Sequence, residues 1–374
     1  MTIIYVGVIQ FLSELIKTLF PRLSILSLSI ILYICPMIAD LRSDTFTKPS
    51  AAMLEVMFHA QVGDDVFRED PTVNALEDYC SSLFGMEAAL FCPSGTMTNQ
   101  IAIKCHTQPG DEVICDKTGH IYIYEGGGIA FNSGCQVKVV DGVRGLITAE
   151  QVQDAINGVD IHKPVSALVS LENTTNRGGG GCYEMAEIIK IKEVCERTGL
   201  KLHLDGARLF NALVAKHQTE KEYGSIFDSI SICLSKGLGA PVGSILLGNA
   251  ALIKKARRVR KVFGGGMRQA GFMAAAGLYA LENNISRLRT DHIHAKQIAE
   301  ELLKKSFIGR MMPVETNIVI FEVKNGEGPA AFCQYMKDRN ILCLPISATQ
   351  VRMVTHLDIS NDMAAHVIKS IKEI

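Results

Sequence analysis

Short apolar runs alternate with longer amphipathic stretches along most of the chain. The runs with the length of buried strands are Ala88 to Cys92, Glu112 to Cys115, Val165 to Leu171, Lys201 to Leu204 and Ser229 to Leu234. The stretches with helical period include Thr72 to Leu83, Met97 to Cys105 and Tyr183 to Thr198. This alternation predicts an α/β fold in which helices cover both faces of a mostly parallel sheet.

The end of the alternating region predicts a second domain. Gly243 to Leu247 follows the preceding strand too closely for a helical crossover, so it should run antiparallel. A long helix from Gln269 to Arg287 then closes a large domain, 40–285. The remaining residues, 286–374, form a small α+β domain with strands near Ile318 to Val323 and Arg352 to Thr355.

The first 39 residues differ in character from the rest. Leu23 to Ala39 is a run of 17 uncharged residues, preceded by Lys17 and Arg22. This pattern is typical of a signal anchor or of the apolar region of a signal peptide, although Pro36 interrupts it. We interpret residues 1–39 as an optional apolar extension, which leaves membrane anchoring open.

Charge and cysteine usage narrow the class of protein. The formal net charge is -1 and the basic residues are scattered, so no nucleic-acid footprint is expected. The one basic run, Lys254 to Lys261, suits the solvated face of a helix or a subunit contact. The 11 cysteines lie mostly in apolar segments without paired metal spacing. They predict buried thiols in a reducing, cytoplasmic compartment and no metal site.

Lys236 and Asp205 carry the strongest chemical signal. Lys236 ends an apolar strand and is followed by glycines that allow a cofactor to approach closely. Asp205 ends the preceding strand, at the edge where open α/β sheets bind ligands. An amine for an aldehyde and a carboxylate for a pyridinium nitrogen are what pyridoxal 5'-phosphate requires.

Further candidates surround this pair. Gly95, in the segment Cys92 to Asn99, begins a helix whose free N–H groups suit an anion, although Ser94 and Thr98 could equally be capping residues. Arg268, after Gly264 to Gly266, is a second candidate for a phosphate and alternatively a charge at a subunit interface.

Two histidines and two arginines complete the candidates from the residues themselves. His120 follows a strand where a ring could stack on a pyridine. His162 is either close to the substrate or an ordinary surface histidine, and both interpretations remain open. Arg208 and Arg352 are candidates for a bidentate grip on an amino-acid carboxylate.

Several motifs, in one order from Asp40 to the C-terminus, resemble the L-threonine aldolases of the aspartate aminotransferase fold type. They are Asp-Leu-Arg-Ser-Asp-Thr at Asp40, Val-Gly-Asp-Asp-Val-Phe at Val62, Asp-Pro-Thr-Val-Asn-Ala-Leu-Glu at Asp70, Ser-Leu-Glu-Asn-Thr at Ser170, Asp-Gly-Ala-Arg at Asp205, Cys-Leu-Ser-Lys-Gly-Leu-Gly at Cys233 and Gly-Gly-Gly-Met-Arg-Gln at Gly264. The resemblance implies a large domain with a mostly parallel seven-stranded sheet, a small C-terminal domain and cleavage of L-threonine or L-allo-threonine to glycine and acetaldehyde.

The resemblance also implies roles for residues of this chain. Lys236 would bond the cofactor aldehyde, Asp205 would pair with the pyridine nitrogen and His120 would stack on the ring. The other implied contacts are those of Gly95, Thr96 and Arg268 with the phosphate, and those of Ser43, Arg208 and Arg352 with the carboxylate of a β-hydroxy amino acid. A homo-oligomer, dimer or tetramer, with active sites shared between subunits is expected.

The chain departs from the family pattern at three places. Thr175 stands where histidine is more usual, Met97 replaces a polar residue beside the phosphate, and Gly178 to Gly181 predicts an unusually flexible loop. Two other functions remain as alternatives. One is β-elimination or transamination with the same cofactor, and the other is a membrane-tethered, catalytically silent relative.

Overall fold

The computed structural model describes residues 38–324 and 328–374, and Ala39–Ile374 form one compact unit. The apolar extension expected over residues 1–39 therefore lies outside the described residues, apart from Ile38 and Ala39. Ala39 and Asp40 form strand β1, which pairs in parallel with Ile341 and Leu342 of β11. No helix within the described part of the chain has the length and apolarity to cross a membrane.

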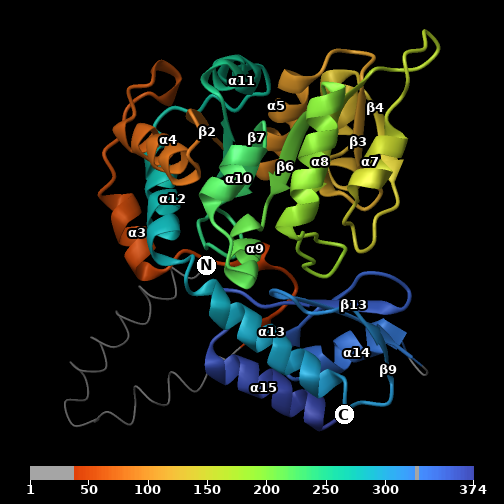
Figure 1. The fold of residues 1–374 in the computed structure, drawn as a ribbon. Helices are drawn as coiled ribbons and strands as arrows, with labels where there is room; N and C mark the ends of the chain where they lie inside the picture. Colours follow the sequence, from red (N-terminus) through yellow and green to blue (C-terminus); the bar gives the residue numbers. More distant parts are fainter. Residues whose placement is uncertain (1–37, 325–327) are drawn as a thin grey trace, which may run out of the picture. The chain divides into compact units, whose positions relative to one another are not determined.

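A seven-stranded sheet forms the centre of the larger part (Figure 1), in the order β2-β8-β7-β6-β5-β3-β4. Its strands are β2 (Ala88–Cys92), β3 (Glu112–Asp116), β4 (Gln136–Val140), β5 (Ser166–Glu172), β6 (Lys201–Gly206), β7 (Ser229–Cys233) and β8 (Ser244–Gly248). Only β8 runs antiparallel to its neighbours β2 and β7. The predicted α/β fold and the predicted direction of β8 are confirmed.

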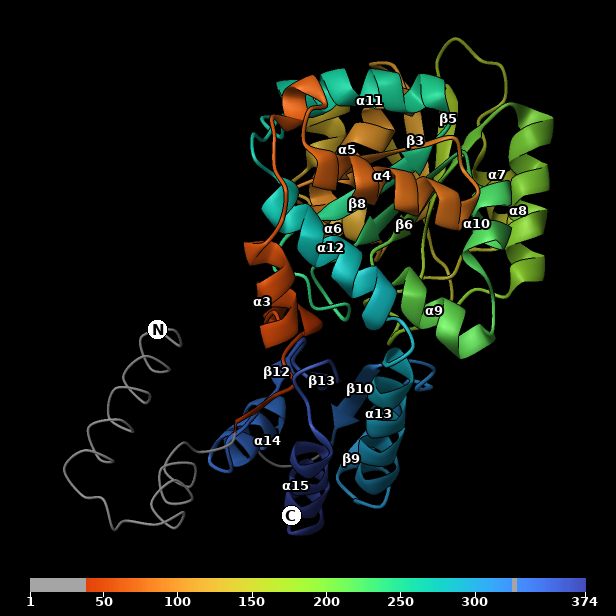
Figure 2. The same ribbon diagram turned by 90° about the vertical axis from the view of Figure 1, so that its left-hand side faces the viewer.

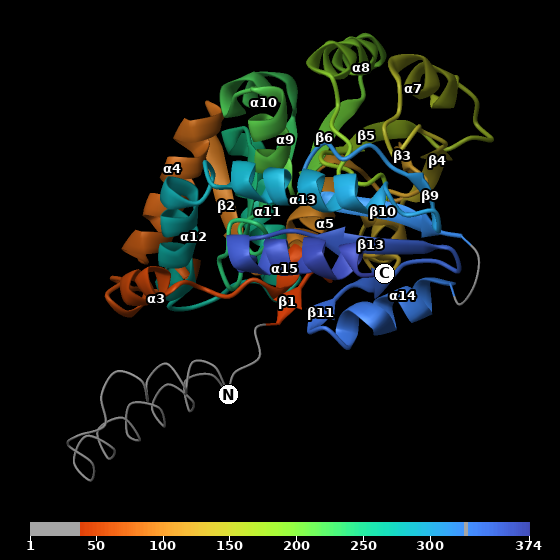
Figure 3. The same cartoon turned by 90° about the horizontal axis from the view of Figure 1, so that it is seen from below.

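Helices cover both faces of this sheet, with α7, α8 and α10 on one face and α5 on the other (Figure 1, Figure 3). Because both faces are covered, β3 and β7 are buried along their whole length, which explains their unbroken apolar runs. The helices of this part are α3 (Ala51–Phe58), α4 (Pro71–Phe84), α5 (Gly95–His106), α6 (His120–Ile123), α7 (Ala149–Ala155), α8 (Met185–Thr198), α9 (Leu209–Lys216), α10 (Glu220–Ile226), α11 (Ala250–Val262) and α12 (Gly271–Asn283), with the short turns η1 (Asp44–Phe46), η2 (Asp65–Phe67) and η3 (Ile129–Ser133).

Two elements differ from the sequence-based prediction. The strand β4 was not predicted, because it is an edge strand whose residues are mostly exposed and lack an apolar run. The helix predicted from Gln269 to Arg287 is present as α12 but is shorter than expected. Helix α12 ends at Asn283, and the side-chain amide of the next residue, Asn284, donates to the carbonyl of Leu238 at 2.7 Å.

The C-terminal part is an α+β unit with its own core. Its sheet has the order β12-β13-β10-β9, and helices α13 and α15 pack together against it (Figure 2). The elements are α13 (Leu288–Leu302), β9 (Ile308–Met311), β10 (Ile318–Val323), α14 (Gly328–Lys337), β11 (Ile341–Leu342), β12 (Leu344–Pro345), β13 (Gln350–Val354) and α15 (Asn361–Lys372). Ala39 and Leu41 belong to this core, so the residues around β1 pack with the C-terminal unit.

The loop after β5 connects the two parts. Arg144 donates to the carbonyl of Gly178 at 3.0 Å and pairs with Glu315 at 2.7 Å. The Thr316 hydroxyl donates to the carbonyl of Gly180 at 3.0 Å. These bonds hold the segment after β5 against the C-terminal unit, at the edge where the carboxyl ends of the parallel strands lie.

The same contacts contradict the prediction of a flexible loop at Gly178 to Gly181. All four glycines are buried. A Cβ atom on Gly178 would lie 1.9 Å from the carbonyl oxygen of Arg144, and one on Gly180 would lie 2.2 Å from the Thr316 hydroxyl. Glycine is therefore required here by close packing, and the loop is held by its neighbours.

The ten described cysteines are free thiols, and nine of them are buried. The predicted buried thiols are therefore confirmed within residues 38–324 and 328–374.

Candidate active site

The carboxyl ends of β5, β6 and β7 lie side by side. Glu172, the last residue of β5, is in register with Asp205 on β6. Asp205 is in register with Ser231 on β7, and Lys236 follows β7 by three residues. The parallel sheet thus gathers two buried carboxyl groups and an amine at one edge.

Asp205 is held by an amide. Its Oδ2 accepts from Asn99 Nδ2 at 2.9 Å and its Oδ1 accepts from the Ala207 amide at 3.1 Å. The side-chain oxygen of Asn99, Oδ1, lies 3.1 Å from His203 Nε2, and this contact fixes the orientation of the Asn99 side-chain amide. His203 is fully buried, and burial lowers its pKa to about 4, so its neutral ring donates to Asn99.

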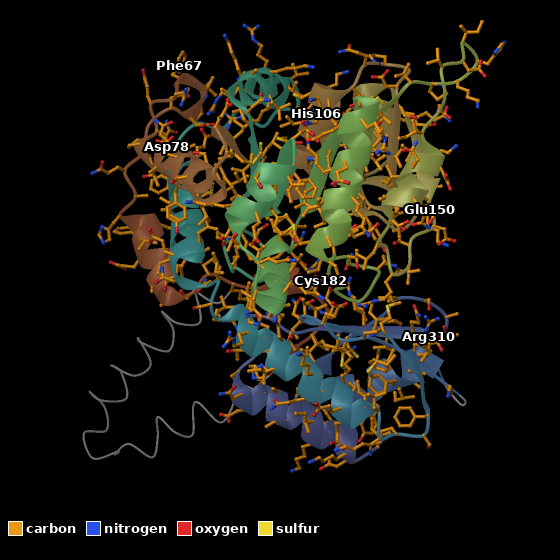
Figure 4. The ribbon with its side chains drawn as sticks, in the orientation of Figure 1. Phe67, Asp78, His106, Glu150, Cys182 and Arg310 are labelled. Carbon is orange, nitrogen blue, oxygen red and sulfur yellow. The ribbon has the colours of Figure 1, made fainter. Side chains whose placement is uncertain are left out.

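The hydrogen bonds that begin at Asp205 continue from His203 to the opposite end of the sheet. Ser229 Oγ lies 2.8 Å from His203 Nδ1 and 2.8 Å from His106 Nε2. His106 appears in Figure 4 at the end of the sheet away from Cys182, which lies close to the C-terminal unit. A chain of hydrogen bonds through Asn99, His203 and Ser229 therefore connects Asp205 to His106 and holds its carboxylate in place.

His120 is anchored at two points. Its backbone N–H donates to Glu172 at 2.8 Å, and its Nδ1 lies 3.0 Å from Glu125 Oε1. Burial opposes the charged imidazole, but the bond to Glu125 and the charge of Asp205 outweigh it, so the pKa of His120 is raised. A small cavity lies among His120, Glu172 and Asp205, so the imidazole and both carboxyl groups face one space.

The pKa of Glu172 is also shifted by its surroundings. It is partly buried, and its burial together with the neighbouring Asp205 raises its pKa to about 7. Its other oxygen accepts the backbone N–H of Asn176 at 2.8 Å. Glu172 therefore ties the backbone of His120 to the loop after β5.

The Lys236 amine is available for chemistry. Its one hydrogen bond within residues 38–324 and 328–374 is a long contact of 3.5 Å to Cys233 Sγ, and none of the carboxylates described there pairs with it. Its backbone is fixed, because its carbonyl accepts from the Thr47 hydroxyl at 3.0 Å. Its positive charge is among the causes that lower the pKa of Asp44, and it opposes the rise in the pKa of His120, so Lys236 lies near both residues.

Helix α5 begins beside this lysine. Ser94 is its N-cap and accepts the N–H of Met97 at 3.2 Å, while Thr96 is exposed. A Cβ atom on Gly95 would lie 2.6 Å from Cys233 Sγ, so the start of the helix sits directly against the loop of Lys236. The helix has 12 residues, and its first N–H groups and its dipole favour an anion. Thr98 is buried and bonds to Ser231 at 2.6 Å, which makes it an interior residue.

Two guanidinium groups converge on the site from different elements. Arg208 makes a bidentate pair with Asp44, at 2.7 Å and 2.6 Å. Arg352, on β13, donates to the Asn176 side chain at 2.8 Å and to the carbonyl of Arg42 at 3.2 Å. Burial and the nearby charge of Arg208 lower the pKa of Arg352.

In the chain, Ser43 stands between Arg42, which accepts from Arg352, and Asp44, which pairs with Arg208, and it is 8% exposed. Arg352 Nε is buried without a partner in the described residues. An incoming carboxylate would provide the missing acceptor and offset the repulsion between the guanidinium groups.

Two of the sequence candidates lie elsewhere. The side chain of His162 is 83% exposed and bonds to Asp160, in the loop before β5. This loop is at the opposite end of the strand from Glu172, so the structure does not bring His162 to the site. Arg268 has a side chain that is 58% exposed and pairs with Asp64 at 2.7 Å.

The site fits pyridoxal 5'-phosphate. A buried carboxylate, an amine without an ion pair and a helix N-terminus stand at one sheet edge, as a pyridinium nitrogen, an aldehyde and a phosphate require. The three groups come from β6, from the loop after β7 and from α5. Each was singled out from the sequence.

Other polar residues of the site were missed. They are Asp44, Asn99, Glu125, Glu172 and Asn176. Glu172 could have been found, because it ends a buried strand next to the one that ends in Asp205. Asp44, Asn99 and Asn176 bond to residues more than 100 positions away, and Glu125 bonds to His120 five positions away without a local pattern that identifies it.

Known proteins resemble this chain over most of its length. A model of the beta-eliminating lyase family matches residues 40–325. The low specificity L-threonine aldolase of Escherichia coli (strain K12) is 46% identical over 330 residues, which cover 88% of this chain and 96% of that protein. Low-specificity L-threonine aldolase 1 of Arabidopsis thaliana is 41% identical over 328 residues, 86% of this chain and 92% of that protein.

A solved structure has the same fold. The threonine aldolase of Leishmania major superposes with a TM-score of 0.79 at 22% identity, covering 90% of this chain and 99% of that chain.

Proposed function

The chain belongs to the L-threonine aldolases, within the beta-eliminating lyase family, and we propose that the residues at its sheet edge carry out the reaction of that family. The protein is a pyridoxal-phosphate-dependent lyase that cleaves L-threonine to glycine and acetaldehyde. L-allo-threonine is a second substrate in this proposal. The observation that carries the assignment of residues is the convergence of Asp205, Lys236 and the start of α5 on one edge of the sheet.

In this proposal the cofactor has four kinds of contact. Asp205 pairs with the pyridinium nitrogen, Lys236 bonds the aldehyde, His120 stacks on the ring, and Gly95 and Thr96 hold the phosphate with Arg268 as a further partner. When bound, the cofactor supplies an electron sink for the bond that breaks in the amino acid. The hydrogen bond from Asn99 to Asp205 supports the first contact, since it fixes the carboxylate.

The substrate carboxylate is bound by Arg352, Arg208 and Ser43. Arg352 has an unsatisfied Nε, and Arg208 is held in place by Asp44. A bidentate guanidinium grip fixes the orientation of an amino acid, so it selects the bond to be broken. His120 is the candidate that remains for accepting the proton of the β-hydroxyl group, because His162 lies at the other end of the strand.

We further propose a homo-oligomer with shared active sites. Phe58, Phe67 and Phe131 are 78%, 68% and 90% exposed, which favours burial against another copy. Arg268 is exposed, and its one ion pair among the described residues is with Asp64, so it is free to serve the phosphate of a neighbouring subunit. The free thiols support a reducing compartment, and we propose the cytoplasm.

The reaction is tested by release of acetaldehyde from L-threonine and L-allo-threonine, followed with a coupled alcohol dehydrogenase. Lys236→Ala should reduce the release to the background of the assay while the circular dichroism spectrum stays the same. Lys201→Ala is the matched control, because Lys201 begins β6 at the opposite edge of the sheet and its side chain is 53% exposed. Turnover by Lys236→Ala close to that of the parent would exclude the assignment of Lys236. Formation of a keto acid in place of acetaldehyde would favour transamination.

A further inference from the structure

Glu125 is a buried carboxyl group that points at the ring of His120. Its side chain is 0% exposed, and Oε1 lies 3.0 Å from His120 Nδ1. It also accepts from Asn99 Nδ2 at 2.9 Å and from Gln100 Nε2 at 2.7 Å. Asn99 and Gln100 each donate an N–H to it, one to each oxygen, so Glu125 acts as an acceptor, which is the role of a carboxylate.

This arrangement decides which nitrogen of His120 carries the proton. A carboxylate only accepts, so Nδ1 must donate to Glu125. The neutral ring then keeps its lone pair on Nε2, which bonds to no other residue in the described part of the chain. The backbone of His120 is fixed as well, because its N–H donates to Glu172 at 2.8 Å. The ring has therefore one orientation and one tautomer.

The charges around His120 come from four elements. Glu125 follows α6, Glu172 ends β5, Asp205 is on β6, and Lys236 follows β7. Glu125 is the one of these groups that bonds to the ring. Its negative charge stabilises the imidazolium form, so it raises the affinity of Nε2 for a proton.

We propose that Glu125 is the positioning residue of His120, which it keeps in the Nδ1–H form and makes a stronger base at Nε2. This inference rests on the proposed function, in which His120 receives the proton of the substrate. In that step the O–H bond of the β-hydroxyl group breaks and an N–H bond forms at Nε2, directly or through one water. The oxygen electron pair becomes the carbonyl of the departing aldehyde, and the Cα–Cβ electron pair stays with the glycine fragment.

The test measures the pKa of His120 separately from activity. Hydrogen–deuterium exchange at the imidazole C2 atom, followed as a function of pH by mass spectrometry, reports the pKa of single histidines in the full-length enzyme. The tryptic peptide from Thr118 to Lys138 contains His120 as its only histidine. The midpoint for the parent should lie above the ordinary histidine value of about 6.5.

Glu125→Gln preserves the shape of the side chain and removes the charge. The midpoint should fall by about one pH unit. Because the base must be unprotonated, the acid limb of the kcat/KM profile should move to lower pH by the same amount, while kcat on the plateau falls. Glu112→Gln is the matched control. Glu112 is 1% exposed and accepts from Asn157 at 2.9 Å, at the start of β3.

Two results would overturn the inference. One is a Glu125→Gln midpoint equal to that of the parent. The other is a parent midpoint at or below about 6.5, which can be measured even if the variant does not fold. A parent with no threonine cleavage would instead refute the proposed function, and the exchange midpoint would still show whether Glu125 sets the pKa of His120.

Discussion

Asp44 and Arg208, 164 positions apart in the chain, form a buried bidentate ion pair, with Arg208 Nε 2.7 Å and Nη2 2.6 Å from the carboxylate oxygens. Burial disfavours the charged carboxylate, but Arg208 outweighs it and lowers the pKa of Asp44 to about 2. Arg208 is buried as well, and Asp44 raises its pKa despite burial. The short turn η1, which begins at Asp44, thus fixes the guanidinium group of Arg208 in the site.

Asp44→Asn removes the charge of this pair and leaves Arg208 buried without a counterion. We expect the free energy of unfolding to fall by about 3 kcal/mol and KM for L-threonine to rise, because Arg208 is no longer held. Urea unfolding and initial rates measure the two effects. Since the lowered pKa of Asp44 gives stability that is lost only below about pH 4, the difference from the parent should be constant from pH 5 to 8. A difference that grows over this range would contradict the ion-pair assignment.

Arg352→Lys tests the grip on the substrate carboxylate. A lysine keeps the charge but cannot make two parallel hydrogen bonds, so KM for L-threonine should rise by roughly 10-fold or more. Binding of the cofactor, measured by titration of its absorbance, should not change. Arg310→Lys serves as the control, because Arg310 is an exposed residue of β9 (Figure 4). An unchanged KM would remove Arg352 from the substrate site.

Glu172 should give the protein a distinctive dependence of stability on pH. Its pKa is raised to about 7 by burial and by Asp205, so the folded state holds a proton that the unfolded state has lost above pH 4.5. Its contribution to stability should therefore decrease by up to about 3 kcal/mol as the pH rises from 4.5 to 7. The parent minus Glu172→Gln difference removes the contribution of every group that does not interact with Glu172, so it reports Glu172 together with its neighbours Asp205 and His120. A difference that does not depend on pH would show that Glu172 titrates normally.

Gly178→Ala tests the close packing after β5. The added Cβ would lie 1.9 Å from the Arg144 carbonyl, so the loop must shift and the protein should lose about 1–3 kcal/mol. The loop carries Asn176, which bonds to Arg352, so KM should rise as well. A Cβ on Gly158 would meet nothing within 4 Å, and Gly158→Ala should therefore be neutral in the same thermal unfolding assay. Equal stability of both variants would support the flexible loop that the sequence predicted.

A mixture of Arg268→Ala and Lys236→Ala subunits, assayed at a cofactor concentration that leaves Arg268→Ala largely empty, tests the shared site. Arg268→Ala should weaken the binding of the cofactor by roughly 10-fold, because a phosphate contact is lost. After exchange with Lys236→Ala subunits, the mixture should regain part of the activity. In a hybrid dimer one site combines Lys236 from one subunit with Arg268 from the other, so that site is complete. Arg258→Ala, on the exposed side of α11, is the control for the loss of an arginine. No recovery after proven exchange would place both residues in the site of one subunit.

The sequence by itself determined the framework of the protein. Buried strands between helices are visible as unbroken apolar runs, because both faces of the sheet are covered. Lys236 and Asp205 could be identified because each directly follows or ends such a run, and parallel strands bring their carboxyl ends to one edge. Edge strand β4 lacks this signal and was missed.

Only the tertiary structure decided which polar groups complete the site. Asp44 pairs with Arg208, 164 positions away, and Asn99 bonds to Asp205, 106 positions away. Arg352, which lies in the C-terminal unit, bonds to Asn176 in the loop after β5. These pairs depend on how elements pack, and no spacing along the chain encodes them. For the same reason His162 was a reasonable candidate from the sequence. A loop before a strand and a loop after it look alike in sequence, but they lie at opposite ends of the sheet.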